Sequence, residues 1–378
     1  MIKQIVKTLD GNEATADVAY NFTEVATIYP ITPSSPMAEH VDVWSANGRK
    51  NIGAVHGASE TGSLCSSFTA SQGLMLMIPV MHRLSGELKP VVLHIAARTV
   101  GTHTMSIFGD HSDVMGCRNT GWAMLCSASV QECADLAAVA HLSTIKGRVP
   151  FMHFFDGFRT SHEIQKIKML PAEELGKLID RDALYHFKHT GLNPEHPVMR
   201  STVTNPDMFF QSREANNPWY QRLPYIVQDY MDQISELTGR PYHLFDYYGA
   251  PDAEHVVIAM GSVTGAIQET IDKLCKEGKK VGFIQVHLYR PFSLEHFMKA
   301  MPDTVRTITV MDRTKEPGAL GEPLYEDVCA AMSHVKQDVT VLACRYGLSS
   351  KDVPPASINA VFTNMDSLQP KNHFTLGI

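Results

Sequence analysis

The sequence predicts an α/β protein with two largely parallel sheets, each flanked by helices. Apolar strand-like runs alternate with helix-period segments twice along the 378 residues. Several of these runs, such as "PVVLHIAA" at 90–97, are almost wholly apolar, which is typical of parallel strands covered on both faces. The chain is also long enough for two domains with separate cores.

The first alternation runs to about residue 160. Its expected helices are 12–26, 35–48, 72–87 and 129–147, and its expected strands are 27–31, 66–71, 90–97, 122–128 and 149–155. The helix at 129–147 has a serine at its start and a glycine at its end, the usual helix boundaries. No β-branched run lies between the helix at 35–48 and a small-residue helix near Gly57, so one strand is expected to be missing there.

Residues 160–254 differ because proline and asparagine are frequent and only one clear helix, 223–239, is expected. We interpret them as an extended connecting segment that belongs to a first domain, 1–254. A second alternation then defines a smaller α/β domain, 255–378. Its expected strands are 255–262, 280–289, 304–312 and 339–347, and its expected helices are 263–278, 293–301, 324–335 and 355–365.

Composition excludes several classes of function. The net charge of −7 gives no basic surplus for nucleic acid or anionic lipid, and no apolar run is long enough to span a membrane. The seven cysteines form no C-x-x-C pair, so neither an Fe–S cluster nor any other metal site is expected. They are expected to be buried and reduced, which indicates a soluble, cytoplasmic protein.

The stretch Tyr29–Pro36, "YPITPSSP", follows an apolar run and offers hydroxyls at Thr32, Ser34 and Ser35. Its prolines make a stiff exit from the strand, at the sheet edge where open α/β sheets bind ligands. The alternative is a rigid turn in which Ser35 caps the next helix. Both interpretations stay open on these residues alone.

Charged residues follow two other strands. Arg98 comes directly after a buried strand, where a guanidinium is costly unless an anion satisfies it. The run Asp110–Asp113 could be a metal or acid–base cluster, but a helix cap with acidic first-turn residues is the commoner outcome, and His103 and His111 are expected to be structural. Asp156, Arg159 and His162 follow the last strand, where an Asp–Arg pair holding a loop is expected. Phosphate-loop, dinucleotide and serine-hydrolase motifs are absent from the sequence.

Nine motifs, taken in order, resemble one known family from near residue 9 to the C-terminus. They include "DGNEATADVAYNFTEVATIYPITPSSPMAEHVDVW", "FTASQGLMLMIP", "SIFGDHSDVM", "FFDGFRTSHEIQKI", "DRTKEPGALGEPLY" and "KNHFTLGI". The chain resembles the first two domains of pyruvate:ferredoxin (flavodoxin) oxidoreductases. The resemblance implies a pyrimidine-side thiamine diphosphate domain, followed by a domain like the C-terminal domain of transketolases.

The resemblance also implies a chemistry. The family oxidatively decarboxylates pyruvate on thiamine diphosphate, transfers the acetyl group to coenzyme A and passes electrons through Fe–S clusters to ferredoxin or flavodoxin. Thr32 matches the threonine that hydrogen-bonds the substrate, and Arg98 matches the arginine that holds the pyruvate carboxylate. Tyr29 and Pro30 match the segment that lines the pyrimidine side of the cofactor.

Two departures from the family pattern change what is expected. After Ile52 the family has a further strand and turn, "V-E-M-Q-S-E-A-G", whose glutamate hydrogen-bonds the aminopyrimidine ring, and Glu60 is not expected to replace it. The coenzyme A domain, the cysteine-rich domain and the magnesium-containing diphosphate domain are also not found. Thiamine diphosphate and its magnesium are therefore expected to be held mostly by other domains, and the Fe–S clusters to lie outside this chain.

The preferred hypothesis is the N-terminal part of a single-chain pyruvate:ferredoxin or flavodoxin oxidoreductase that is incomplete and inactive alone. It would meet pyruvate directly, and coenzyme A and ferredoxin or flavodoxin through the missing domains, either as a dimer or in association with those domains. The alternatives are an α-type subunit of a multi-subunit 2-oxoacid enzyme and a non-catalytic relic or binding module. A stand-alone transketolase-like carboligase is disfavoured because the diphosphate motif is missing.

Overall fold

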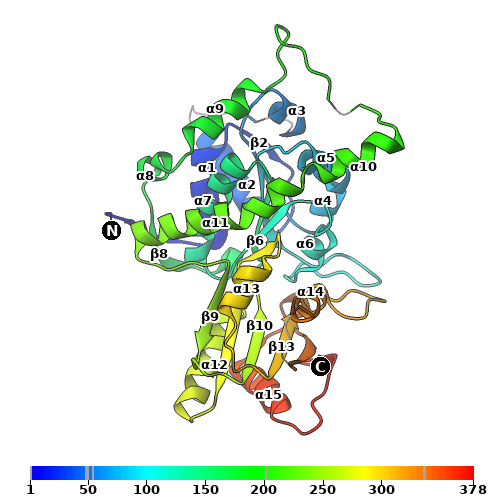
Figure 1. The fold of residues 1–378 in the computed structure, drawn as a ribbon. Helices are drawn as coiled ribbons and strands as arrows, with labels where there is room; N and C mark the ends of the chain where they lie inside the picture. The colour runs from blue at the N-terminus through cyan, green and yellow to red at the C-terminus, as the bar shows by residue number, and fades with distance from the viewer. Residues whose placement is uncertain (1, 47–50, 53–54, 201, 335–337) are drawn as a thin grey trace.

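The computed structural model describes residues 1–378 except 1, 47–50, 53–54, 201 and 335–337. It confirms an α/β fold built on two mostly parallel sheets flanked by helices (Figure 1). The first sheet has the strand order β12-β6-β7-β5-β4-β2-β3, and the second has the order β15-β14-β13-β10-β11-β9. In both sheets the parallel pairing brings the carboxyl ends of neighbouring strands to a common edge.

Four strands of the first sheet are buried throughout. In β4, β5, β6 and β7 every residue is buried, as expected for parallel strands covered on both faces. The strands of this sheet are β2 (Val25–Ile28), β3 (Asn51–Ile52), β4 (Cys65–Thr69), β5 (Val91–Ala97), β6 (Ala123–Ser127), β7 (Phe151–Asp156) and β12 (Leu288–Arg290). The helices between them are α1 (Gly11–Phe22), α2 (Ser35–Ala46), α3 (Val55–Glu60), α4 (Ser71–Leu76), α5 (Ile78–Gly86), α6 (Ser112–Gly116) and α7 (Val130–Gly147).

Helix α7 is buried almost throughout and packs against α1 and α11. Its N-cap is Ser129, as predicted, whose hydroxyl accepts a hydrogen bond from the backbone N–H of Glu132. The helix ends at Gly147, as predicted, and the left-handed C-cap residue that follows is Arg148. Gly147 lies within the helix, where an added Cβ would be 2.6 Å from a methyl of Leu223, so this glycine allows close helix packing.

The expected missing strand requires a correction. A two-residue strand, β3, pairs in parallel with β2, so the alternation continues at this place, although in very short form. The residues on either side of β3 lie outside the described part of the chain. The length of β3 still sets it apart from β4 and β5, which have five and seven residues.

The second sheet includes β9, which precedes the expected second domain. In turn β12, which lies within the expected second domain, pairs with the first sheet. Its strands are β9 (Phe245–Gly249), β10 (His255–Ala259), β11 (Val281–Val286), β13 (Thr307–Asp312), β14 (Thr340–Arg345) and β15 (Phe374–Thr375). The expected single strand at 280–289 is two strands: β11 pairs with β9, and β12 crosses to pair antiparallel with β6. The helices on this sheet are α12 (Thr264–Lys276), α13 (Leu294–Ala300), α14 (Pro323–Met332) and α15 (Pro355–Met365).

The connecting segment contains more structure than its composition predicted. It includes β8 (Gln165–Met169), which pairs antiparallel with β1 (Ile5–Leu9), and the helices α8 (Ala172–Lys177), α9 (Arg181–His189), α10 (Pro206–Glu214) and α11 (Asn217–Thr238). Helix α11 begins earlier than expected because Pro218 lies in its first turn, where a missing N–H costs nothing. By contrast, α10 buries none of its residues.

Two further features of the chain bear on function. All seven cysteines are free, and five of them are buried. Among the helices that the structure describes, none combines the length and apolarity that crossing a bilayer requires.

Candidate substrate site at the edge of the first sheet

The predicted site residues, and residues that the prediction missed, lie where adjacent strands of the first sheet end. The Tyr29–Thr32 segment follows β2, Ser71 follows β4, Arg98 follows β5 and Gly157 follows β7. Because β7, β5, β4 and β2 are neighbours in parallel, their carboxyl ends meet at one edge. This is the edge at which open α/β sheets bind ligands.

The structure brings the two predicted catalytic residues together. Arg98 is 7% exposed, and its Nη1 donates a hydrogen bond to the backbone carbonyl oxygen of Thr32 at 2.8 Å. Its Nε is buried and makes no hydrogen bond to any residue that the structure describes. A buried guanidinium N–H without an acceptor is costly, so Arg98 is suited to a carboxylate that reaches it from outside the chain.

Asp113 fixes the backbone around Arg98. Its carboxylate accepts hydrogen bonds from the N–H groups of Arg98 at 3.1 Å, Ser71 at 2.7 Å and Val114 at 2.7 Å. It therefore ties the ends of β4 and β5 to α6. Burial raises the pKa of Asp113 to about 7, although the three N–H donors act in the opposite direction.

The Thr32–Pro33 segment is held from two further sides. The side-chain amide of Asn12, fully buried in the first turn of α1, donates to the Pro33 carbonyl oxygen at 3.0 Å. Gly157 lies so close to this segment that an added Cβ would be 2.8 Å from the Pro33 ring and 2.5 Å from the Ala97 carbonyl oxygen. Arg98, Asn12 and Gly157 together give the segment a defined position.

The predicted cofactor-binding residues form an open surface. Tyr29 is 68% exposed, and Pro30 and Thr32 are exposed as well. Both alternatives for the "YPITPSSP" stretch hold in part, since it is a stiff turn and also lies at the sheet edge beside Arg98. Ser35 is the first residue of α2 and so does not cap it, and the Ser34 hydroxyl donates to the Ile31 carbonyl oxygen.

Glu60 lies at the opposite edge of the first sheet. It is the last residue of α3, which leads into the start of β4, whereas Thr32 and Arg98 follow strand ends. Its carboxylate pairs with Lys89 at 3.0 Å and Arg200 at 2.8 Å. Burial alone would raise the pKa of Glu60, but its hydrogen bonds to Glu87 and these cations lower it to about 2. The expectation that Glu60 does not replace the family glutamate is consistent with this position.

Asp156 and Arg159 do not form the expected pair. The buried Asp156 carboxylate instead accepts from His111 at 2.7 Å and lies 2.6 Å from Arg313, which follows β13 of the second sheet. Burial alone would raise the pKa of Asp156, but Arg313 and His111 hold it below its ordinary value. Arg159 pairs with Asp352. The Asp156–Arg313 pair thus joins the two sheets rather than holding a loop of the first.

The other candidates take structural or surface positions. Asp110 accepts from the N–H of Ser112 at 3.0 Å, just before α6. The capping alternative holds only in part, because the N-cap is His111 without a side-chain cap bond, while Asp113 is the expected acidic first-turn residue. His111 is buried and structural, as expected, whereas His103 is exposed on a loop, which corrects its predicted role. His162 is exposed and stacks on Phe158 with 5.1 Å between the rings.

A second contact joins the sheets beside β12. His287, 1% exposed, lies 3.4 Å from the Glu132 carboxylate at the start of α7 and 3.3 Å from Asp246 of β9. Burial alone would lower the pKa of His287, but the two carboxylates raise it to about 9. His287 and these two carboxylates therefore lie where β12 crosses into the first sheet.

Comparisons with known proteins bear on this arrangement. A family model described as pyruvate flavodoxin/ferredoxin oxidoreductase, thiamine diphosphate-binding, matches residues 17–232, more than half of the chain. The chain belongs to the pyruvate flavodoxin/ferredoxin oxidoreductase family. A second model, the pyruvate:ferredoxin oxidoreductase core domain II, matches residues 253–358. Both agree with the resemblance on which the site was predicted.

Curated relatives from several bacteria align with nearly all of the chain. The pyruvate:ferredoxin oxidoreductase of Moorella thermoacetica is 57% identical over 98% of this chain and 33% of its own length. The pyruvate-flavodoxin oxidoreductase of Klebsiella pneumoniae is 55% identical over 99% of this chain and 33% of its own length. The chain thus spans about a third of the curated relatives that it matches, as their N-terminal part.

Solved structures support the fold assignment. A 2-oxoglutarate:ferredoxin oxidoreductase from Magnetococcus marinus superposes with a TM-score of 0.67, covering 96% of this chain and 65% of the other at 18% identity. A split-gene transketolase superposes with a TM-score of 0.52 over 93% of this chain and 91% of the other at 10% identity. Both predicted fold relationships, to 2-oxoacid:ferredoxin oxidoreductases and to transketolases, are confirmed.

Sequence reasoning missed the residues that position the site. Asn12, Asp113 and Gly157 were not singled out as supports, since an amide, a carboxylate and a glycine carry no local pattern that names a distant carbonyl or N–H. The fact that Asp113 falls in the first turn of a short helix favoured a capping role. Its contact with Ser71, 42 positions earlier, depends on strand order and is visible only in the folded chain.

Proposed function

We propose that this chain supplies the substrate-binding edge and the pyrimidine-side wall of a pyruvate:ferredoxin or flavodoxin oxidoreductase, and that it does not turn over pyruvate alone. In this proposal Arg98 holds the carboxylate of pyruvate, and the Thr32 hydroxyl hydrogen-bonds the substrate. Tyr29 and Pro30 line the pyrimidine side of thiamine diphosphate. Coenzyme A and ferredoxin or flavodoxin are met through other domains, either in a longer chain or in a partner.

The observation that carries the proposal is the buried Arg98 guanidinium with its unpartnered Nε. Its Nη1 is committed to the Thr32 carbonyl, which leaves the rest of the fork facing the segment predicted to contact substrate. A planar fork suits a carboxylate, and burial makes the charge-assisted bond stronger than it would be in water. A 2-oxoacid is the substrate class named for the relatives, and its carboxylate suits this guanidinium.

The described residues fit only one side of thiamine diphosphate. The exposed ring of Tyr29 and the stiff Pro30 segment offer a wall for a flat heterocycle. The aminopyrimidine also needs a carboxylate partner, and Glu60 lies at the wrong edge of the sheet, paired with Lys89 and Arg200. We therefore infer that the chain alone neither binds the cofactor measurably nor activates it.

We also propose a division of the chain near residue 254. The two family models support it, since the first ends at residue 232 and the second begins at residue 253. The division is not clean in the sheets, because β9 precedes residue 254 and β12 crosses back to β6. The two units are therefore expected to unfold together.

Substrate binding tests the proposal without requiring turnover. Pyruvate titrated into the isotopically labelled chain should give saturable NMR shifts around Arg98, and Arg98→Met should abolish them. A matched control is Arg306→Met, an exposed arginine of the second sheet, which should leave the shifts unchanged. In an enzyme reconstituted with the missing domains, Arg98→Ala should raise KM for pyruvate on the order of 10- to 100-fold, the cost of one charged hydrogen bond.

Two results would contradict the proposal. Pyruvate shifts that survive Arg98→Met would remove Arg98 from the site. Pyruvate-dependent reduction of ferredoxin by the purified chain, with thiamine diphosphate, magnesium and coenzyme A added, would show that it is active alone.

A further inference from the structure

The second sheet has a crevice that the substrate site does not use. Its strand order places β13 and β10 side by side at the centre, with β11 beyond β10 and β14 beyond β13. The chain leaves β10 through α12 toward β11, and later leaves β13 through α14 toward β14, so the loops after β10 and β13 separate. At such a switch point open α/β sheets form a crevice at the carboxyl ends of their strands.

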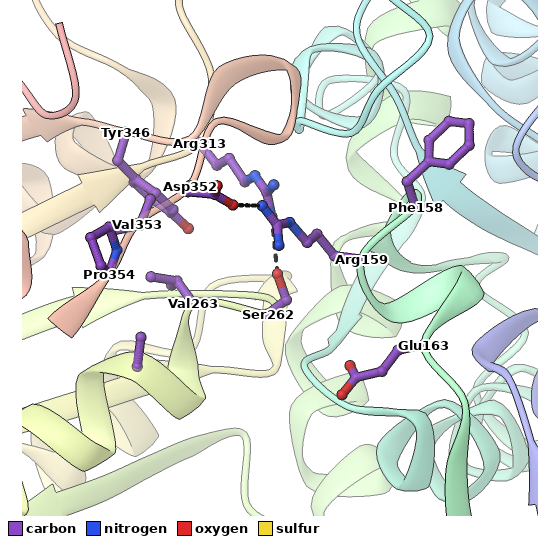
Figure 2. Close-up of a pocket in the computed structure, with 11 residues that line it drawn as sticks. Phe158, Arg159, Glu163, Ser262, Val263, Arg313, Tyr346, Asp352, Val353 and Pro354 are labelled. Carbon is purple, nitrogen blue, oxygen red and sulfur yellow. Dashed lines mark hydrogen bonds and ion pairs between the residues drawn. The ribbon is translucent and has the colours of Figure 1, made fainter.

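A cavity of about 780 Å³ lies at this switch point. Ser262 and Val263 after β10 and Arg313 after β13 form one side of it, and Phe158 and Arg159 after β7 of the first sheet form the other. We call this space the junction cavity. Figure 2 shows the Arg159 side chain reaching across it toward Asp352, beside Arg313 and Ser262. Its volume is in the range of sites that hold small organic ligands.

The inner wall of the junction cavity is cationic. Arg313 is 4% exposed, and its Nε and Nη1 bond the Gly347 carbonyl oxygen at 3.1 Å and the Ser262 hydroxyl at 3.0 Å. Arg159 lies opposite and pairs with Asp352, whose side chain is 82% exposed. A surface pair of this kind contributes little, so an anion in the cavity can replace Asp352 at small cost.

The acidic groups around the cavity do not cancel this wall. Asp156 lies 2.6 Å from Arg313 and offsets its charge, but Asp156 is not among the residues that line the cavity. Glu163 and Asp352 are exposed at the rim, where water screens them. The first turn of α12, a helix of 13 residues that includes Ala266 of the lining, adds partial positive charge on the same side. The inner wall therefore favours an anion.

The remaining wall is apolar. Val263, Ala266, Val353 and Pro354 line the cavity on the side of the second sheet. Phe158 borders it on the side of the first, with its ring directed away from these residues (Figure 2). A bare inorganic anion would leave these surfaces in contact with water. A ligand with an organic body next to its anionic group would cover them.

We propose that the junction cavity is a binding site for an organic phosphate of about nucleotide size. The phosphate group lies between Arg159, Arg313 and the first turn of α12, and the organic part packs against Val263, Val353 and Pro354. Phosphate is the anion that two guanidinium groups and a helix N-terminus can engage together. The site is separate from the Arg98 edge, so it is tested independently of the proposed function.

Calorimetric titration of the purified chain with AMP, ATP and inorganic phosphate tests this proposal. We expect saturable binding of a nucleotide, weakened about tenfold by Arg159→Met, since one charge-assisted bond is lost. Ala266→Phe, which fills the cavity, should abolish binding. The matched control Arg306→Met should bind as the unaltered chain does. Arg313 is not mutated, because its removal would leave the Asp156 carboxylate buried without its cation and would unfold the contact between the two sheets.

Three outcomes would overturn the proposal. One is the absence of saturable binding of either nucleotide at millimolar concentration. Another is nucleotide binding that neither Arg159→Met nor Ala266→Phe alters. The third is inorganic phosphate binding as tightly as the nucleotides, which would show that the apolar wall is not used.

Discussion

The carboxyl edges of the two sheets differ in what covers them. The edge of the second sheet faces the loop after β7, and the buried Asp156–Arg313 pair closes it against the first sheet. The edge of the first sheet at β2 is open, and Tyr29 there is 68% exposed. At the closed edge charged groups are paired within the chain, whereas at the open edge Arg98 keeps an unpartnered Nε. The closed edge joins the two sheets around the junction cavity, whereas the open edge exposes the proposed substrate site.

The largest expected effect is at the closed edge. Asp156→Ala leaves Arg313 buried without its carboxylate, which should lower the free energy of unfolding by about 3–5 kcal/mol. Urea unfolding measures this difference. Asp352→Ala, which removes the exposed partner of Arg159, is the control and should cost less than about 1 kcal/mol. Equal costs for the two variants would show that the Asp156–Arg313 pair does not hold the junction.

The support of the open edge can be tested through Gly157. An added methyl would lie 2.5 Å from the Ala97 carbonyl oxygen and 2.8 Å from the Pro33 ring, so Gly157→Ala should displace the Thr32–Pro33 segment. We expect a loss of about 1–3 kcal/mol in the free energy of unfolding and weaker pyruvate shifts in the NMR titration. Gly176→Ala in α8 meets no atom within 4 Å and should be neutral or stabilising. Unchanged pyruvate shifts in Gly157→Ala would separate this glycine from the substrate site.

The crossing of β12 predicts a loss of stability in alkali. The pKa of His287, about 9 in the folded chain, lies above its ordinary value of 6.5, so its contribution is complete below pH 6.5 and is lost as the pH rises through about 9. Between about pH 7 and pH 9 this predicts a fall of about 2 kcal/mol in the free energy of unfolding. Urea unfolding at the two pH values measures it. His287→Gln should remove the fall and the exposed His189→Gln should keep it, and the reverse pattern would refute the assignment.

Much of the fold could be predicted because a buried strand shows as a run of apolar residues in the local sequence. The largely apolar runs at β5 and β7 identified parallel strands directly. The site was also partly predictable, since Thr32 and Arg98 follow strands that end at a common edge, and the structure joins them through a 2.8 Å hydrogen bond. Their roles toward pyruvate, and those of Tyr29 and Pro30 toward the cofactor, remain predictions.

The failures share a physical cause. The run at 280–289 looked like one strand because each of its residues is compatible with extended backbone, yet β12 leaves the second sheet to pair with β6. Asp156 was assigned to Arg159, three positions away, while its partner Arg313 comes from the other sheet. In both cases the deciding neighbour is more than 150 positions distant, and no local pattern encodes it.

The sequence by itself determined the alternation of strands and helices, the family and the placing of Arg98 at a sheet edge, because periodicity and motif are properties of neighbouring residues. Only the tertiary structure decided that the Arg98 fork bonds the Thr32 carbonyl, that Glu60 faces the opposite edge, and that Arg159 and Arg313 face each other across a cavity. These are matters of which strands lie side by side, and strand order is set by the packing of the whole core.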